Sequence, residues 1–177
     1  LVRIGTCGLL HSSIDVGQFV LSDYAVGLDN LSHYYEIETS AKEENILNKL
    51  NDLEVLPPRV SPYISASSDS LNKKFKGEKV KSGITLTAPG FYGPQGRSLR
   101  IPLAKKDFVN QLENRTIENH IIANFEMESS ALFTLGKALG HDCTTLCLGI
   151  ANRPKGTFLT NYKPQMKELI RYVLERI

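Results

Sequence analysis

Residues 124–130 read NFEMESS and mark the point where a polar stretch of the chain passes into an apolar one. In this segment Glu126 and Glu128 flank Met127, so two carboxylates stand beside a thioether. A carboxylate can accept two hydrogen bonds from a vicinal diol, and a thioether can pack on a sugar ring. The segment therefore predicts a sugar-binding surface. The alternative is a plain helix start, with Asn124 as N-cap and the glutamates complementing the positive helix end.

Apolar periodicity on either side of this segment predicts alternating strands and helices. We expect strands at 1–6, 18–26, 60–66, 84–87 and 144–150, and helices at 41–53, 71–75, 108–112, 126–139 and 164–177. No linker, repeat or low-complexity tract interrupts them, so the pattern predicts one α/β domain over residues 1–177, with helices covering a sheet. Ligands of such folds gather at the carboxyl ends of strands.

Composition narrows the class of protein. A net charge of +2 on 177 residues offers no field suited to nucleic acid or an anionic membrane, and we expect the basic run 73–81 to be solvated. Three cysteines are an odd number, which argues against a disulfide framework. No apolar run is long enough to span a bilayer and no leader opens the chain, so we expect a cytoplasmic protein.

The first residues, LVRIGT, read as a strand already under way, without a methionine or a polar lead-in. We therefore expect an N-terminal portion to be missing. The four histidines form no metal-spaced cluster, and neither a nucleophile elbow nor a phosphate-binding Walker loop occurs. Metal catalysis and covalent nucleophilic catalysis have little support, and we expect no metal and no cofactor.

Polar residues fall where the first strand is expected to end. Arg3 lies in a stretch that otherwise looks buried, where an unpaired guanidinium would be costly. It needs either a bound anion or an internal ion pair to a glutamate, and the local sequence leaves both open. Thr6, at the expected start of a glycine-containing turn, would add a hydroxyl for the same anion.

A second polar segment, GFYGPQGR at residues 90–97, follows another expected strand. Gln95 can donate and accept hydrogen bonds at once, which suits the imide edge of a pyrimidine. Arg97 can only donate, which suits a carbonyl oxygen, and Phe91 could pack against a base. The alternative is a glycine-rich surface loop with a solvated Arg97.

Taken together, these motifs resemble the nucleoside phosphorylase family, and most closely its uridine phosphorylase branch. The resemblance rests on VRIGTCG at 2–8, GFYGPQGR at 90–97, NFEMESSALF at 124–133 and ANR at 151–153, in matching order along the chain. It implies a three-layer sandwich with a central mixed sheet. It also implies a reaction in which inorganic phosphate, as co-substrate, attacks the anomeric carbon of a nucleoside and releases the base and ribose 1-phosphate.

The resemblance also implies roles for particular residues, with Arg3, Arg97 and Glu128 as the catalytic set. Phosphate would be held by Arg3 and Thr6, and the ribose by Thr6, Glu126, Met127 and Glu128. The base would be lined by Cys7, Gly8, Phe91, Gln95, Arg97 and Arg153. The active species would be a homodimer or a homohexamer.

Two positions depart from related patterns. Purine-cleaving relatives use an aspartate as acid where this chain has Asn152, an amide that cannot act in that way, so the exchange favours pyrimidines. Cys7 replaces a common threonine, which removes a hydroxyl near the base. The alternatives are a hydrolytic nucleosidase, a purine nucleoside phosphorylase, or a non-catalytic nucleoside-binding module if the chain is truly truncated. Arg3 argues against hydrolysis, because a water nucleophile needs no buried cation.

Overall fold

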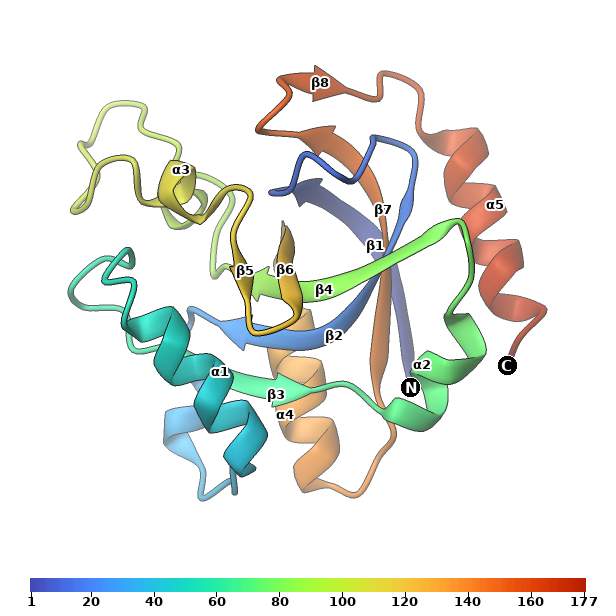
Figure 1. Ribbon diagram of the computed structural model, residues 1–177, viewed down its shortest axis with the longest axis horizontal. Coiled ribbons are helices and arrows are strands. Elements are labelled where there is room, and N and C mark those ends of the chain that lie inside the picture. The colour runs from blue at the N-terminus through green and yellow to red at the C-terminus, as the bar shows by residue number, and fades with distance from the viewer.

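The computed structural model describes residues 1–177 and contains a mixed β-sheet with helices packed against it (Figure 1). The strands are β1 (Val2–Leu9), β2 (Phe19–Gly27), β3 (Tyr63–Ala66), β4 (Val80–Thr87), β5 (Thr116–Ile117), β6 (His120–Glu126), β7 (Thr144–Asn152) and β8 (Thr157–Phe158). The α-helices are α1 (Ala41–Asn51), α2 (Asp69–Phe75), α3 (Phe108–Leu112), α4 (Ser129–Ala138) and α5 (Lys163–Leu174). Two 3-10 helices, η1 (Leu31–Tyr34) and η2 (Gly93–Gln95), lie in connecting segments.

The sheet has the strand order β3-β2-β4-β6-β1-β7-β8, with β5 added beside β6. Strand β2 also pairs with β7, so the pairings β2-β4-β6-β1-β7-β2 form a closed ring. Side chains from β1, β2, β6 and β7 pack together inside this ring and include Cys7, Val20, Ala123 and Cys147. Strand β1 runs parallel to β7 but antiparallel to β6. The antiparallel pairing places the end of β6 beside β1.

Helices cover the sheet on more than one side. Leu169 and Val173 of α5 pack with Phe75 of α2 in one hydrophobic core cluster. Ile46 and Leu50 of α1 belong to a second core cluster. Figure 1 shows α5 and α1 at opposite sides of the molecule, with α4 beneath β2 and β3. The predicted α/β architecture, a mixed sheet flanked by helices, is confirmed. None of the helices has both the length and the apolar composition needed to cross a membrane.

Residues 120–126, which include the first three residues of NFEMESS, form a strand that the sequence pattern did not predict. β6 covers His120–Glu126, and its Ile122 and Phe125 are buried. Asn124 is fully buried in this strand and accepts a hydrogen bond from Thr85, so it is not an N-cap. The helix begins at Ser129 in place of the predicted residue 126. Asn124 and Glu126 are polar although they are buried, so apolar periodicity did not predict this strand.

Other predicted boundaries shift for identifiable reasons. β1 passes through the expected turn and continues to Leu9, with a register irregularity between Cys7 and Gly8, so Thr6 lies inside a strand. β4 begins four residues earlier than the predicted residue 84, because Val80–Gly83 pair with β2. The short strands β5 and β8 have no counterpart among the predicted strands.

We expect Gly27→Ala to lower the free energy of unfolding by about 2 to 3 kcal/mol, the usual cost of overpacking a core. Gly27 pairs with Tyr63 across β2 and β3, and an added Cβ would lie 2.2 Å from the Tyr63 ring. That ring is fixed because its hydroxyl donates to Ser130 Oγ over 3.0 Å. Urea denaturation followed by circular dichroism measures the loss.

Gly8→Ala is the matched control, because an added Cβ at this strand glycine would meet no heavy atom within 4 Å. Its free energy of unfolding should stay within about 0.5 kcal/mol of the wild type. Equal losses in the two variants would contradict the packing argument.

Candidate functional site

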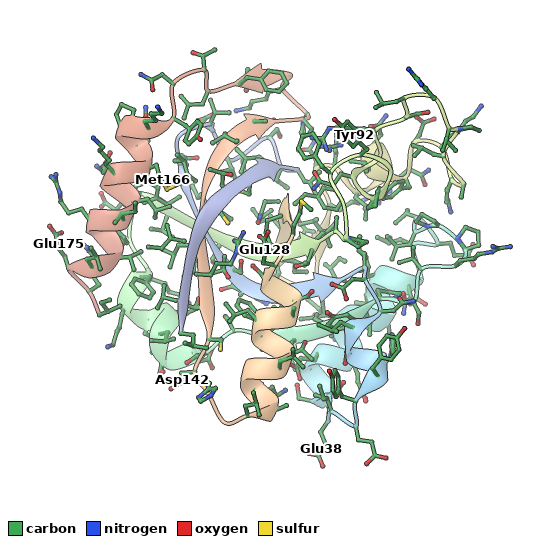
Figure 2. The ribbon with its side chains drawn as sticks, turned by 180° about the vertical axis from the view of Figure 1, so that it is seen from behind. Glu38, Tyr92, Glu128, Asp142, Met166 and Glu175 are labelled. Atoms are coloured by element: carbon green, nitrogen blue, oxygen red, sulfur yellow. The ribbon has the colours of Figure 1, made fainter.

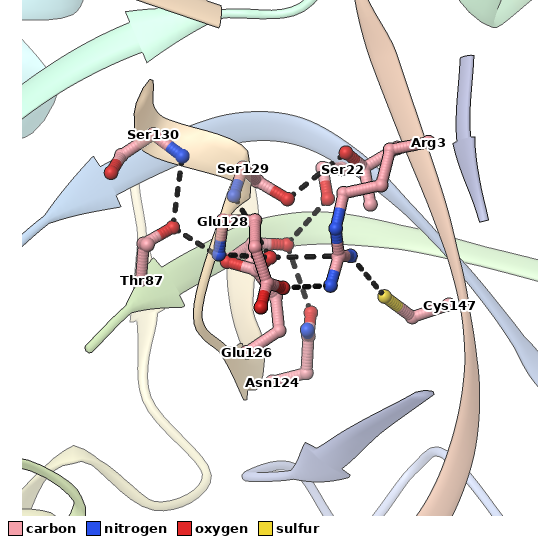
Figure 3. Close-up of polar contacts among 11 residues, drawn as sticks. Arg3, Ser22, Thr87, Asn124, Glu126, Glu128, Ser129, Ser130 and Cys147 are labelled. Atoms are coloured by element: carbon pink, nitrogen blue, oxygen red, sulfur yellow. Dashed lines mark hydrogen bonds and ion pairs between the residues drawn. The ribbon is translucent and has the colours of Figure 1, made fainter. Parts of the chain in front are cut away.

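The centre of the candidate site is the carboxylate of Glu126, which lies at the end of β6 and is 4% exposed. Its Oε1 accepts a hydrogen bond of 2.6 Å from the hydroxyl of Thr87 at the end of β4. Its Oε2 accepts from the backbone N–H groups of Glu128 and Ser129, each over 2.9 Å (Figure 3). Glu126 thus satisfies the first N–H groups of α4 and places a negative charge at the positive end of that helix.

Arg3 reaches this carboxylate from β1. Its Nη1 lies 3.2 Å from Oε2 of Glu126 and donates to Cys147 Sγ over 3.3 Å, while its Nη2 pairs with Glu128. Burial alone would lower the pKa of Arg3, but the Cys147 thiol and the two carboxylates outweigh burial and raise that pKa. Of the two compensations expected for this guanidinium, the ion pair to glutamates is therefore present in the structure.

Glu128 and Met127 differ from Glu126 in their exposure. The Glu128 side chain is 58% exposed and Met127 is 41% exposed. Figure 2 shows Glu128 at the end of α4 that faces the loop carrying Tyr92. The exposed carboxylate beside the exposed thioether gives the combination that a sugar diol and ring require.

The loop after β4 forms a second polar group. Arg97 stacks on the ring of Phe91 at 3.9 Å and donates to Gln95 Oε1 over 2.9 Å and to the Phe91 carbonyl over 2.5 Å. Gly96 has a φ of 75°, and a Cβ there would lie 2.5 Å from Val109 Cγ2. Glycine is therefore required between the amide and the guanidinium. Burial lowers the pKa of Arg97.

Arg153 joins this group from the residue after β7. Its backbone N–H donates to the Leu9 carbonyl over 3.1 Å, and its guanidinium lies 5.6 Å from the centre of the Phe125 ring. Burial, together with repulsion from Arg97, lowers the pKa of Arg153 to about 10, with Glu113 acting in the opposite direction. Its Nη2 is buried without a hydrogen-bond partner. Both arginines remain charged at neutral pH and leave donors for an electron-rich ligand.

The remaining predicted site residues lie in or beside β1 and β7. Cys7 is buried, and burial raises the pKa of its thiol. Thr6 follows Arg3 by three positions, and its neighbour Ile4 packs on the α5 side of the sheet. No hydrogen bond of the Thr6 hydroxyl ties it to another residue, and its role beside Arg3 at the phosphate stays a prediction.

Asn152 has a structural role that the sequence did not reveal. Its Nδ2 donates to the carbonyls of His11 and Ile14, and its Oδ1 accepts from the backbone N–H of Lys155. The side chain is completely buried. With its amide fully engaged, Asn152 contacts backbone and is not free to contact a base.

Two residues of the site were missed from sequence. Thr87 and Cys147 contact Glu126 and Arg3 respectively. Thr87 ends a predicted strand just before Pro89, so the rule that draws attention to polar residues at strand ends could have found it. Cys147 lies within an apolar strand and carries no such signal.

One cavity lies beside the loop that carries Arg97. It has a volume of about 660 Å³ and an apolar lining that includes Leu28, Tyr92, Arg97 and Phe108, but it contains neither Arg3 nor the two glutamates. The chemistry of the polar residues, more than the size of this cavity, therefore marks the candidate site. Nowhere in residues 1–177 do three or more His, Cys, Asp or Glu side chains gather in a way that could hold a metal ion.

Comparison with known proteins identifies the family of this chain. A family model of the phosphorylase superfamily matches residues 1–175. The chain belongs to the phosphorylase superfamily. Uridine phosphorylase of Thermococcus kodakarensis is 27% identical to it over 161 residues, which are 89% of this chain and 50% of that protein. Uridine phosphorylase of Haemophilus influenzae is 27% identical over 156 residues, which are 86% and 53% of the two chains.

Solved structures place this superfamily member beside nucleoside phosphorylases. A Trypanosoma brucei nucleoside phosphorylase with uridine phosphorylase activity superimposes with a TM-score of 0.87 at 28% identity, covering 99% of this chain and 62% of that one. Apo uridine phosphorylase of Schistosoma mansoni gives 0.61 at 24% identity, covering 98% and 58%, and supports the fold alone. The chain spans about half the length of the curated relatives it matches.

We expect Glu126→Gln to lower the free energy of unfolding by about 2 to 3 kcal/mol, because it leaves a partly buried Arg3 without its buried counter-charge. Glu128→Gln should change it by less than about 0.5 kcal/mol, because an exposed carboxylate contributes little. Chemical denaturation of both variants in parallel checks the difference. A Glu128 variant as unstable as the Glu126 variant would contradict the assigned division between buried and exposed carboxylate.

We expect Arg153→Met to raise the free energy of unfolding by about 1 kcal/mol, because it removes a desolvated cation with an unpartnered nitrogen beside Arg97. The methionine keeps an apolar stem over Phe125. Arg100→Met, at an exposed position of the loop that carries Arg97, should change it little. Thermal unfolding at pH 7 measures both. A lower melting temperature in the Arg153 variant alone would contradict the expected gain.

Proposed function

We propose that the full-length protein cleaves the glycosidic bond of uridine-type pyrimidine nucleosides with inorganic phosphate, giving uracil and ribose 1-phosphate. The observation that carries this proposal is the contact of Arg3 with Glu126 and Glu128, which sets a cation beside an exposed sugar-binding carboxylate. The relatives named uridine phosphorylase support the same reading at 27% identity. The co-substrate is phosphate, and no further cofactor is needed.

The charge distribution suits this chemistry. Glycosidic cleavage builds positive charge on the sugar and negative charge on the departing base. Carboxylates and phosphate on the sugar side stabilise the first, and the guanidinium groups of Arg97 and Arg153 stabilise the second. Holding phosphate, ribose and base in line supplies a further part of the rate, because alignment replaces an encounter between separate molecules. No covalent intermediate on the protein is required.

Recognition of a pyrimidine rests on the loop after β4. Arg97 and Gln95 are already joined by a hydrogen bond of 2.9 Å, so an imide edge can meet an amide and a guanidinium side by side. Phe91 is 53% exposed and offers a ring face. The engaged amide of Asn152 supplies no acid for a purine nitrogen, which favours pyrimidines over purines.

Recognition of the ribose falls to Glu128 and Met127. The exposed Glu128 carboxylate would accept from the two ribose hydroxyls, and Met127 would pack on the ring. We further propose a cytoplasmic protein that works as a homodimer or homohexamer, as in the family that the motifs resemble.

The test is release of uracil from uridine by the purified full-length protein, with and without inorganic phosphate. We expect turnover only with phosphate, together with stoichiometric ribose 1-phosphate, which an enzymatic assay for the sugar phosphate measures. Inosine, as the purine counterpart, should be cleaved at least about tenfold more slowly, since a site built for one hydrogen-bonding edge discriminates against another.

The outcomes separate the alternatives. Equal rates without phosphate would establish a hydrolytic nucleosidase, and faster cleavage of inosine would establish a purine nucleoside phosphorylase. Uridine binding by calorimetry without turnover of any nucleoside would leave a non-catalytic binding module. Each of these results would overturn the proposed reaction.

A further inference from the structure

Thr87 is a buried residue that contacts the Glu126 carboxylate of the candidate site. It ends β4, is 1% exposed, and stands opposite Glu126 in the parallel pairing of β4 with β6. Its hydroxyl accepts a hydrogen bond of 3.0 Å from the backbone N–H of Ser130. Because that donor already supplies a hydrogen, the single hydroxyl proton of Thr87 is directed to Oε1 of Glu126, 2.6 Å away.

The Glu126 carboxylate is thereby held at both oxygens. Oε1 is fixed by Thr87, and Oε2 by the N–H groups of Glu128 and Ser129 and by Nη1 of Arg3. The terminal torsion of a glutamate is broad, so a carboxylate anchored at one oxygen alone can turn. The hydrogen bond from Thr87 removes this freedom.

We infer that Thr87 is a positioning residue for phosphate use: through Glu126 it fixes the guanidinium of Arg3 in the place where phosphate is bound. This inference rests on the proposed function, which assigns phosphate to Arg3. Thr87 touches neither phosphate nor nucleoside. Its effect passes through two side-chain contacts, Thr87 to Glu126 and Glu126 to Arg3, both visible in Figure 3.

The chain offers a matched comparison two residues away. Thr85 lies on the same strand, is equally buried, and uses its hydroxyl in two buried hydrogen bonds, to Ser22 Oγ over 2.6 Å and to Asn124 Oδ1 over 2.9 Å. Removing either threonine hydroxyl therefore disturbs a buried polar pair. Only Thr87 is bonded to the carboxylate that holds Arg3.

The experiment uses the full-length protein as wild type, Thr87→Val, Thr87→Ser and Thr85→Val. Calorimetric titration with inorganic phosphate gives the dissociation constant, and steady-state kinetics give kcat and KM for phosphate and uridine separately. We expect Thr87→Val to weaken phosphate binding and raise the phosphate KM roughly tenfold, the order expected when a buried charge-assisted hydrogen bond is lost. The uridine KM should change less than about twofold, since Glu128 keeps its exposed carboxylate.

Thr87→Ser keeps the hydroxyl and should restore phosphate affinity to within about threefold of the wild type. Thr85→Val should lose stability but retain the wild-type phosphate KM. If Thr87→Val binds phosphate as the wild type does, or no worse than Thr85→Val, the positioning role is wrong while the proposed function stands. If the wild type neither binds phosphate nor requires it, the proposed function fails and the inference fails with it.

Discussion

One buried carboxylate, that of Glu126, ties the candidate site to the fold. A buried negative charge is tolerated only when hydrogen bonds and an opposite charge compensate it. Here the compensation comes from three separate elements: Thr87 of β4, the first N–H groups of α4, and Arg3 of β1. Each must be correctly placed for the charge to be satisfied. The geometry of the site is therefore set by the same contacts that join these elements.

Because of this constraint, the two glutamates of NFEMESS have different roles. Glu126, with its oxygens taken by the protein, has a structural role and holds Arg3. Glu128 follows at the start of α4, where its side chain is 58% exposed even though it pairs with Arg3. Although the two glutamates are only two residues apart, the Glu126 carboxylate is buried and the Glu128 carboxylate is exposed. The family resemblance assigned both glutamates to the ribose and only Glu128 to the catalytic set.

Much of the fold follows from local sequence, and part of it does not. Apolar periodicity located most helices and strands, because it reports which face of each element is buried. It failed at 120–126, where Asn124 and Glu126 are polar yet buried, and their partners come from β4 and β1. The pairing of β2 with β7, which closes the ring of strands, could not be predicted from local sequence either, because it joins segments more than a hundred residues apart.

The candidate site shows the same limit. Polar residues at expected strand ends pointed to Arg3 and Arg97, and the rule extends to Thr87. Arg3 lies near the beginning of β1, and β1 pairs with β6 in the antiparallel direction. Its pairing with the glutamates depends on that register, which no local pattern encodes.

The two ends of the site differ in how well their charges are compensated. Around Glu126 the hydrogen bonds are complete, so that end is stable before any ligand arrives. At the other end Arg97 and Arg153 repel each other, and Arg153 keeps a buried nitrogen without a partner. An electron-rich group placed between these cations would satisfy the nitrogen and relieve the repulsion together. If the proposed function holds, we expect ligand binding to gain most free energy at the arginine end and the glutamate end to contribute geometry.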